Sequence, residues 1–346
     1  MIGIRADAND IVATGHIMRC ITIAGELRKM GEEVLFLLAD GYGVPMLEEK
    51  KFPYVILNTN WEKPIEEITV LANEIVSNGI NAVLFDSYRM TKEYFTLLGE
   101  TLNRTVRIAY IDDLFEEIYP VDVLVNYNAY HVQFPYKEAY EGNGRRTRLC
   151  LGSSYVPLRE EFGKTDLSDG CENTVLLSCG GGDTLQSLHG ILERAVTDKR
   201  FHDTEFHVIV GRYHQKKERL EQLAAAHDNI ILHHNVSNMA ELMEQNCIAV
   251  SAAGTMLYEL CAMERPTVFF ITADNQRYDS DFFAADDRMY FAGDIRKDRE
   301  TCIGQVLDGM HELLSDKKMR ICMKEKLREV TDGKGASRIA RILEEM

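Results

Sequence analysis

The chain opens on Ile2-Gly3-Ile4, continues through Arg5-Ala6-Asp7-Ala8-Asn9-Asp10, and then reads Thr14-Gly15-His16-Ile17-Met18-Arg19-Cys20. Its first residues have the apolar character of a buried strand. Apolar side chains then recur with helical spacing at positions 17, 21, 24 and 27. The stretch therefore predicts a strand, a polar loop and a helix, which is the opening unit of a doubly wound parallel sheet.

Polar side chains gather in the loop of this first unit. Ligands of open parallel sheets bind at the carboxyl ends of the strands, so Arg5, Asp7 and Gly15-His16 lie where active-site residues are usually found. An imidazole can be neutral or charged near pH 7, which suits His16 to proton transfer. The alternative is that His16 only caps the helix that follows.

Strand and helix patterns alternate along the rest of the chain. In the first half, the predicted strands are residues 34–38, 82–85 and 106–111, and the predicted helices are residues 65–76 and 93–102. In the second half, the predicted strands are residues 174–179, 206–210, 230–232, 248–251 and 267–271, and helices are expected after 185, over 215–225, near 239–244 and after 256. This alternation predicts an α/β protein with two Rossmann-like doubly wound domains, each a parallel sheet between layers of helices.

The alternation is interrupted between Tyr127 and Asp169, where glycine, proline and polar residues are frequent. A chain of 346 residues is long for a single core, and two domains of roughly 150 to 180 residues are the natural expectation. We therefore expect an N-terminal domain over residues 1–155 and a C-terminal domain over residues 156–346, facing each other across a cleft. The last helix, after Ser337, is expected to be able to pack back on the first domain.

A glycine-rich loop in the second domain has the character of a ligand-binding loop. Gly180, Gly181 and Gly182 follow a predicted strand and precede a helix. Glycines let the backbone approach a ligand closely, and free amides at a helix start favour an anion. The loop lacks both the Gly-x-Gly-x-x-Gly spacing and the lysine of a P-loop. A glycine turn without any ligand is the alternative.

A second loop, Ser251-Ala252-Ala253-Gly254-Thr255, also ends a strand and starts a helix, and Glu259 lies one helical turn further. Amides near Gly254 and Thr255 can hold a diphosphate, while Glu259 can accept hydrogen bonds from ribose hydroxyls. The alternative is a capping box formed by Thr255 and a nearby acid, although its spacing is off by one residue.

The pair Asn275-Gln276 follows the last predicted strand and offers donors and acceptors that could orient sugar hydroxyls or phosphate oxygens. The alternative is that this pair simply starts a helix. In the first domain Asp112 and Asp113 end a predicted strand, but adjacent strand residues point to opposite faces. No His-x-x-x-His motif or acidic cluster completes a site, and we therefore expect no metal.

The formal charge of −16 argues against nucleic acid or an anionic membrane as the main partner, although local donors can still bind an anionic small ligand. No apolar run approaches the roughly 18 residues that span a bilayer, and the early first strand leaves no room for a signal peptide. The eight cysteines lack metal-type clustering and are expected to stay reduced. We therefore expect a cytoplasmic protein that binds a small molecule and needs no cofactor.

Several short motifs occur in order along nearly the whole chain. They are Arg5-x-Asp7, Gly15-His16-x-x-Arg19-Cys20, Ile111-Asp112-Asp113, Asn126-x-Asn128, Gly152-x-x-Tyr155-x-x-Leu158-Arg159, Gly180-Gly181-x-Asp183, Gly254-Thr255-x-x-x-Glu259, Asn275-Gln276 and Asp332-Gly333-x-Gly335. In these motifs the chain resembles the hydrolases of pseudaminic acid biosynthesis, which act on UDP-2,4-diacetamido-2,4,6-trideoxy-β-L-altropyranose. The resemblance implies a bacterial enzyme with the two-domain fold of B-type (GT-B) glycosyltransferases and no need for a metal.

The resemblance also implies roles for individual residues. His16 matches the catalytic histidine and would activate a water that attacks the anomeric carbon with inversion, releasing UDP. The positions that match substrate-contacting residues are Arg5, Asp7, Gly15, Asn275 and Gln276. The positions that match the nucleotide side are Gly180, Gly181, Gly182, Gly254, Thr255 and Glu259.

Three positions depart from the family pattern. Ala13 and Ala253 stand where glycine is common, and Tyr258 stands where tryptophan is common. Alanine does not readily take positive φ, so the phosphate loop is expected to follow a slightly different path. Two alternatives stay open: a glycosyltransferase of the same fold, which passes the sugar to an acceptor, and a non-catalytic protein that binds a nucleotide sugar.

Overall fold

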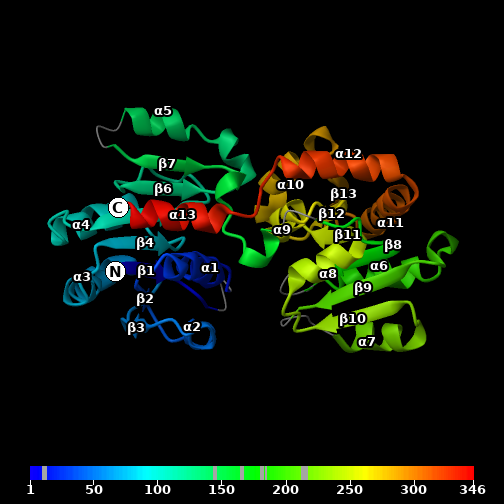
Figure 1. The fold of residues 1–346 in the computed structure, drawn as a ribbon, viewed down its shortest axis with the longest axis horizontal. Helices are drawn as coiled ribbons and strands as arrows, with labels where there is room; N and C mark the ends of the chain where they lie inside the picture. The colour runs from blue at the N-terminus through cyan, green and yellow to red at the C-terminus, as the bar shows by residue number, and fades with distance from the viewer. Residues whose placement is uncertain (10–13, 143–145, 164–166, 180–182, 184, 212–216) are drawn as a thin grey trace. The chain divides into compact units, whose positions relative to one another are not determined.

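The computed structural model describes residues 1–9, 14–142, 146–163, 167–179, 183, 185–211 and 217–346, apart from the side chain of Asn275. The chain divides into two compact units (Figure 1). Unit 1 consists of Met1–Glu160 and Lys334–Met346, and unit 2 consists of Glu161–Gly333. Unit 2 is therefore inserted between two parts of unit 1, and each unit has its own parallel sheet.

Unit 1 is built on a seven-stranded sheet in the order β3-β2-β1-β4-β5-β6-β7, in which every pair of neighbours is parallel. The strands are β1 (Ile2–Ala6), β2 (Val34–Leu38), β3 (Tyr54–Ile56), β4 (Ala82–Asp86), β5 (Arg107–Ile111), β6 (Val123–Asn126) and β7 (Arg148–Leu151). The central strands are nearly continuous apolar runs because helices cover both faces of such a sheet. The strand order reverses between β1 and β4, which is where open parallel sheets bind their ligands.

The α-helices of unit 1 are α1 (Gly15–Lys29), α2 (Val44–Lys50), α3 (Ile68–Ser77), α4 (Lys92–Thr101), α5 (Tyr136–Glu141) and α13 (Gly335–Glu344), and its 3-10 turns are η1 (Pro64–Glu67), η2 (Ala129–Gln133) and η3 (Ser153–Tyr155). The 3-10 turn η4 (Glu160–Phe162) spans the boundary between the units. In α1 the apolar face at Ile17, Ile21, Ala24 and Leu27 is buried, as its spacing predicts. The C-terminal helix α13 packs along α1 (Figure 1), so the end of the chain completes unit 1.

Glycines allow the chain to return to unit 1 at this point. Gly333 has φ +74, and a Cβ there would overlap the carbonyl group of Phe162. At Gly335, the first residue of α13, a Cβ would overlap the carbonyl oxygen of Val156. The Asp332-Gly333-x-Gly335 motif therefore permits two close backbone approaches, one within each unit.

Unit 2 is built on a six-stranded parallel sheet in the order β10-β9-β8-β11-β12-β13. Its strands are β8 (Cys171–Ser178), β9 (Glu205–Val210), β10 (Ile230–His234), β11 (Asn246–Ala252), β12 (Thr267–Ile271) and β13 (Tyr290–Asp294). Its α-helices are α6 (Ser187–Ala195), α7 (Lys217–Ala226), α8 (Met239–Gln245), α9 (Met256–Ala262), α10 (Arg277–Ala284), α11 (Arg299–Ser315) and α12 (Lys317–Arg328), with 3-10 turns η5 (Lys199–Phe201), η6 (Asp274–Gln276) and η7 (Ala285–Asp287). The strand order reverses between β8 and β11, so unit 2 has a switch point of its own.

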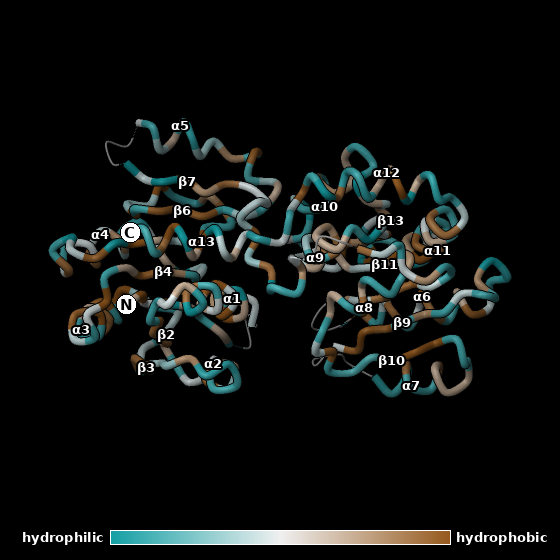
Figure 2. Tube along the Cα trace, in the orientation of Figure 1, coloured by the Kyte–Doolittle hydropathy of each residue, from teal (hydrophilic) through white to brown (hydrophobic). Residues whose placement is uncertain are grey.

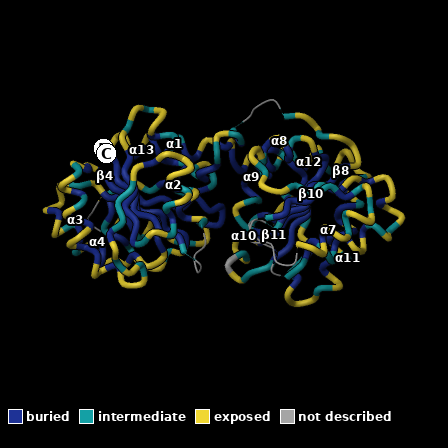
Figure 3. The backbone as a smooth tube through the Cα atoms, turned by 90° about the horizontal axis from the view of Figure 1, so that it is seen from below, coloured by how far each residue is buried: buried dark blue, intermediate teal, exposed yellow. Residues whose placement is uncertain are grey.

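The cores of both units lie along their sheets. The hydrophobic segments follow the strands in Figure 2, and the strands are buried while the outer faces of the helices are exposed in Figure 3. In unit 1, Phe85, Tyr94, Phe95, Tyr110 and Tyr119 form a chain of tilted or edge-to-face ring contacts with centroids 4.8 to 5.9 Å apart. Such pairs add about 0.5–1.5 kcal/mol each beyond their area burial. These ring contacts therefore stabilise the carboxyl ends of β4 and β5.

The predicted strands are confirmed, but four strands of the structure, β3, β6, β7 and β13, were not predicted. The stretch between Tyr127 and Asp169, predicted to be a crossing between domains, contains α5 and the edge strand β7. The strand at Thr267–Ile271 does not close the series, because β13 follows it. The strands β7 and β13 lie at sheet edges and include charged residues, while β3 has three residues and β6 has four, so none of the four has a long apolar run.

Within the described part of the chain, no helix combines the length and the apolar character needed to cross a membrane.

Candidate functional site

The carboxyl ends of β1, β4, β5 and β6 bring a polar cluster together at the switch point of unit 1. His16 lies in the first turn of α1, directly after the loop that follows β1. Asp86 is the last residue of β4, Asp113 follows β5, and Tyr127 follows β6. Residues up to 111 positions apart in the sequence therefore meet at one edge of the sheet, as the parallel topology requires.

His16 is held by Asp86. The Nδ1 atom of His16 lies 2.6 Å from Oδ1 of Asp86, and only 4% of the His16 surface is exposed. Because an ionised carboxylate can only accept, Nδ1 carries a hydrogen, and in the neutral form of the imidazole Nε2 is the nitrogen with the lone pair. Among the described residues Nε2 of His16 has no hydrogen-bond partner. The capping alternative is not observed, since the side chain of His16 bonds to Asp86 rather than to the helix backbone.

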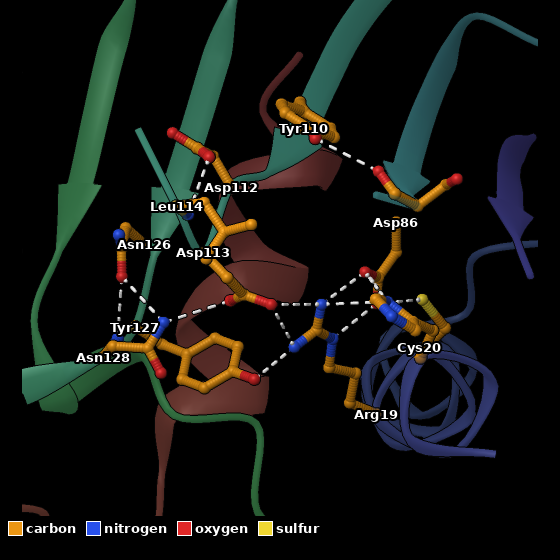
Figure 4. Close-up of polar contacts among 12 residues, drawn as sticks. Arg19, Cys20, Asp86, Tyr110, Asp112, Asp113, Leu114, Asn126, Tyr127 and Asn128 are labelled. Carbon is orange, nitrogen blue, oxygen red and sulfur yellow. Dashed lines mark hydrogen bonds and ion pairs between the residues drawn. The ribbon is translucent and has the colours of Figure 1, made fainter. Parts of the chain in front are cut away.

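Arg19, one helical turn after His16, binds the same carboxylate (Figure 4). Its Nε donates to Oδ2 of Asp86 at 2.5 Å, and its Nη2 donates to Oδ1. Burial alone would raise the pKa of Asp86, but the positive charge of Arg19 and the hydrogen bonds from Arg19 and His16 more than offset it, so this pKa lies well below its usual value. Asp86 is therefore a carboxylate at every pH near neutrality.

Arg19 also links the two sides of the cluster. Its Nη1 and Nη2 donate to Oδ2 of Asp113 at 3.1 Å, and its Nη1 contacts the hydroxyl of Tyr127 (Figure 4). Asn128 fixes the other oxygen of Asp113 through its Nδ2 at 3.1 Å. Burial lowers the pKa of the Arg19 guanidinium, but Asp113 and Asp86 together raise it well above its usual value.

Asp112, the neighbour of Asp113, faces elsewhere, as predicted for adjacent residues at a strand end. Its Oδ1 accepts from the backbone amides of Leu114 and Phe115 at 3.1 Å, and its Oδ2 accepts from the hydroxyl of Tyr136 at 2.7 Å. Burial raises the pKa of Asp112 although these hydrogen bonds act in the opposite direction. Asp112 shapes the loop, and among the described residues it forms no hydrogen bond or ion pair with His16 or Arg19 (Figure 4).

Tyr88 forms the exposed side of the cluster. Its ring meets the ring of His16 edge to face, with centroids 4.5 Å apart and planes at 84°. Tyr88 is 47% exposed, so this ring is a surface that a ligand beside His16 can contact. Partial burial, followed by the negative charge of Asp113, raises the pKa of Tyr88 to about 12, and the hydroxyl is protonated near pH 7.

Arg5 lies within β1 rather than in the loop after it, and its side chain is fully buried. Its Nε and Nη2 each donate to Glu67 at 2.9 Å, and its Nη1 donates to Oδ1 of Asp7 at 2.5 Å. Glu67 is also fully buried, and it accepts from Tyr94 at 2.9 Å as well. Arg5 thus fixes Asp7, whose Oδ2 is buried without a hydrogen-bond partner in the described part of the chain.

Gly15 begins α1, and it is exposed. A Cβ at Gly15 would meet no other atom within 4 Å, so the surrounding protein imposes no requirement for glycine here. The space beside Gly15 is open at the same helix turn that carries His16.

In unit 2, Gly180, Gly181 and Gly182 lie outside the described residues. Their neighbour Asp183 is buried and accepts from the backbone amides of Ser187 and Leu188, both at 2.8 Å. The carboxylate of Asp183 therefore accepts hydrogen bonds from free backbone amides at the start of α6. This is a structural role for the aspartate of the Gly180-Gly181-x-Asp183 motif.

The second loop of unit 2 lies between β11 and α9, at the switch point. Gly254 has φ +142, a conformation that side chains rarely adopt, and a Cβ there would meet nothing within 4 Å. Thr255 is exposed, and its side chain makes no capping hydrogen bond, so the capping-box alternative is not observed. Glu259 lies one turn further in α9 and is partly buried.

The side chain of Asn275 lies outside the part of the chain that the structure describes. Gln276 ends the turn η6 directly before α10. Its Oε1 accepts from the backbone amides of Thr272 at 2.7 Å and Ala273 at 3.2 Å, so this oxygen closes the turn at a helix start. Tyr258 donates to Asp279 at 2.7 Å and is buried in unit 2.

Among the described residues, no group of three or more His, Cys, Asp or Glu side chains is arranged to hold a metal ion.

Sequence reasoning identified His16 but assigned no partner to it. Asp86, Arg19, Asp113 and Tyr127 complete its surroundings. The available signal was positional, because Asp86 and Asp113 each follow a predicted strand, and such ends meet at one edge of a parallel sheet.

Comparisons with known proteins give distant relatives. No protein-family model matches the chain. The chain is 25% identical to the UDP-2,4-diacetamido-2,4,6-trideoxy-beta-L-altropyranose hydrolase of Campylobacter jejuni over 252 residues, which covers 72% of this chain and 84% of that protein. It is 22% identical to the spore coat polysaccharide biosynthesis protein SpsG of Bacillus subtilis, over 100% of this chain and 98% of that protein. An uncharacterized protein of Methanocaldococcus jannaschii is 24% identical over 296 residues, and this alignment covers 80% of the chain but only 56% of that protein's length.

Solved structures establish the fold. MurG of Acinetobacter baumannii superposes with a TM-score of 0.70 at 14% identity, covering 100% of this chain and 99% of that one. The glycotransferase of kitacinnamycin superposes with a TM-score of 0.68 at 15% identity, covering 99% and 98%. The chain therefore has the two-domain fold of GT-B glycosyltransferases, with two parallel-sheet α/β domains, and the predicted fold class is confirmed.

Proposed function

We propose that this protein hydrolyses a UDP-activated 2,4-diacetamido-2,4,6-trideoxy sugar at its anomeric carbon, with inversion and release of UDP. The observation that carries the proposal is the 2.6 Å contact between Nδ1 of His16 and Asp86, which leaves Nε2 as a base. The distant similarity to the Campylobacter jejuni hydrolase supports the reaction and the substrate class.

In the proposed reaction Nε2 of His16 takes a proton from a water molecule as the water oxygen bonds to the anomeric carbon. The bond between that carbon and the diphosphate oxygen breaks, and its electron pair leaves with UDP. Asp86 stabilises the imidazolium that forms, since its carboxylate already holds Nδ1. A positioned general base of this kind contributes about 10²–10⁴-fold to the rate.

Arg19 acts through Asp86 in this proposal. By holding Asp86 ionised and fixed, it keeps the His16 ring in one orientation and one tautomer. Arg5 has the corresponding role for Asp7, whose unpartnered oxygen is proposed to accept from the sugar. Gly15 contributes open space beside the reacting centre, and the exposed ring of Tyr88 offers an apolar surface to the sugar.

Unit 2 is proposed to bind the nucleotide at its own switch point. The backbone amides at Gly254 and Thr255, together with Gly180, Gly181 and Gly182, would bind the diphosphate, and Glu259 the ribose. Asn275 and Gln276 would contact substrate, and Gln276 would do so through its amide nitrogen because its oxygen closes the local turn.

The test is UDP release from candidate UDP-sugars with no acceptor added. We expect rapid release from the wild type and at least about a 100-fold loss of turnover in His16→Asn, while UDP affinity measured by calorimetry stays nearly unchanged. His202→Asn is the matched control, because the side chain of His202 is 74% exposed and lies outside both candidate sites. Normal turnover in His16→Asn would remove His16 from the proposed role.

Glycosyl transfer is the second candidate. Two observations favour it: the fold is shared with glycosyltransferases, and the similarity to SpsG, whose name refers to polysaccharide biosynthesis, extends over the full chain. A transferase would release UDP slowly in water alone and faster when a sugar or lipid acceptor is added. A nucleotide-sugar-binding protein without activity would bind UDP but release none in either assay.

A further inference from the structure

A small pocket in unit 2 lies at the amino ends of β8 and β11. It has a volume of about 120 Å³, and Gly170 and Cys247 form part of its wall. The loop at Gly254 follows the carboxyl end of β11, so this pocket is at the opposite edge of the same sheet. It is therefore separate from the candidate nucleotide site.

Positive side chains of α12 line one side of the pocket. Lys317, Arg320 and Lys324 are spaced three and four residues apart, which places them along one face of the helix. Lys324 is paired with Asp169, at 2.5 Å between Nζ and Oδ1. Lys317 has no ion-pair or hydrogen-bond partner for its side chain among the described residues.

One nitrogen of the Arg320 guanidinium, Nη1, is already hydrogen-bonded within the protein. Its Nη1 donates to the carbonyl oxygens of Leu313 and Leu314 at 2.7 and 2.9 Å, at the end of α11. Its Nε and Nη2 have no acceptor in the described parts of the chain. These two atoms form the same edge with which Arg5 binds both carboxylate oxygens of Glu67. An edge of this kind matches two oxygens of a carboxylate or phosphate.

A further positive charge lies behind the pocket. Arg265 is fully buried and binds only carbonyl oxygens, those of Met263, Asn246 and Ser168. Burial lowers its pKa, since no carboxylate is bonded to it among the described residues. Three lining cations and Arg265 face two lining acids, Asp169 and Glu172, which leaves local positive charge in a chain of net charge −16.

We propose that this pocket is a second anion site, which binds a small oxyanion of the phosphate type through Lys317 and the free edge of Arg320. The fork of Arg320 receives two oxygens, and Lys317 adds a point charge. The buried charge of Arg265 attracts the anion without touching it. A free phosphate ion and the phosphoryl group of a phosphomonoester share this chemistry.

The test compares two neighbouring lysines. Lys317→Glu reverses a charge that lines the pocket, and Lys318→Glu reverses the adjacent charge, which is exposed and does not line it. Both residues lie in the first turn of α12, so the two substitutions change the helix dipole interaction equally. Titration calorimetry with inorganic phosphate, and separately with glycerol phosphate, at constant ionic strength and with saturating UDP measures each dissociation constant.

We expect one phosphate site in the wild type and in Lys318→Glu, and roughly tenfold weaker binding in Lys317→Glu. Tighter binding of the ester than of free phosphate would identify a phosphomonoester as the ligand. No binding by the wild type, or equal affinities in the two variants, would overturn the proposal. Failure of the proposed function would appear separately, as absence of UDP release, and would leave the comparison of the two lysines intact.

Discussion

The substitution Asp86→Asn tests how the His16 cluster is organised. Asp86 accepts from Nδ1 of His16, from Nε and Nη2 of Arg19, and from Sγ of Cys20. An asparagine keeps one acceptor oxygen and turns an NH₂ group toward the remaining donors. The variant therefore loses a negative charge and places donors against donors in a buried site.

Both stability and activity should fall. Breaking one partner of a buried ion pair costs about 3–5 kcal/mol, and Arg19 would retain Asp113 as its only carboxylate among the described residues. If the protein catalyses a reaction through His16, turnover should fall by about 10²–10⁴-fold, because the ring is no longer held in the required tautomer. Urea unfolding and UDP release measure the two effects.

Asp112→Asn is the matched control. Asp112 is likewise a buried aspartate after a strand, but its Oδ1 alone accepts both backbone amides, and an asparagine oxygen can replace it there. Burial also raises the pKa of Asp112, so a neutral side chain suits this site better than it suits position 86. We expect near-normal turnover in Asp112→Asn. Equal losses in the two variants would refute a specific role for Asp86.

The stability difference between wild type and Asp86→Asn should depend on pH. The folded pKa of Asp86 lies below the unfolded value of about 3.9, so its contribution is complete above about pH 5. That contribution is lost as the pH falls through the unfolded value toward the folded one. A difference in unfolding free energy that is the same at pH 7 and at pH 3 would contradict the assignment.

Three further substitutions probe the fold and the second loop. Arg5→Met leaves Glu67 buried without its cation and should lower the free energy of unfolding by about 3–5 kcal/mol in urea; a loss below 1 kcal/mol would argue against the pair. Gly335→Ala places a methyl group against the carbonyl oxygen of Val156 and should cost about 1–3 kcal/mol, seen as a lower Tm. Gly254→Ala should cost about 1–3 kcal/mol from its φ of +142, and calorimetry should also detect weaker UDP binding if this loop holds the diphosphate.

The sequence predicted those parts of the fold that depend on local pattern. Val34–Leu38 and Thr267–Ile271 are continuous apolar runs, and each is a fully buried strand. The strands β3, β6, β7 and β13 were missed because β3 and β6 have only three and four residues, and charged residues shorten the apolar runs of β7 and β13. The helix α1 and its buried face were predicted because the apolar spacing at positions 17, 21, 24 and 27 is uninterrupted.

The candidate site could be predicted only in part. His16 was found from its place after the first strand, but its contact with Asp86 joins residues 70 positions apart. Arg5 was interpreted as a residue of a polar loop, whereas its partner Glu67 lies 62 positions away in a separate turn. No local pattern specifies which buried charges pair, because pairing depends on how helices pack over the sheet.

The interrupted course of unit 1 affects the order in which the protein can fold during translation. A ribosome makes residues 1–160 before unit 2, yet α1 gains its partner α13 only after all 173 residues of Glu161–Gly333 have been synthesised. Ile339, Ile342 and Leu343 of α13 are buried in the finished protein and are synthesised after unit 2. Unit 2 is continuous in sequence and can complete its core during synthesis. At that stage the nascent unit 1 still exposes the surface of α1 that α13 later covers.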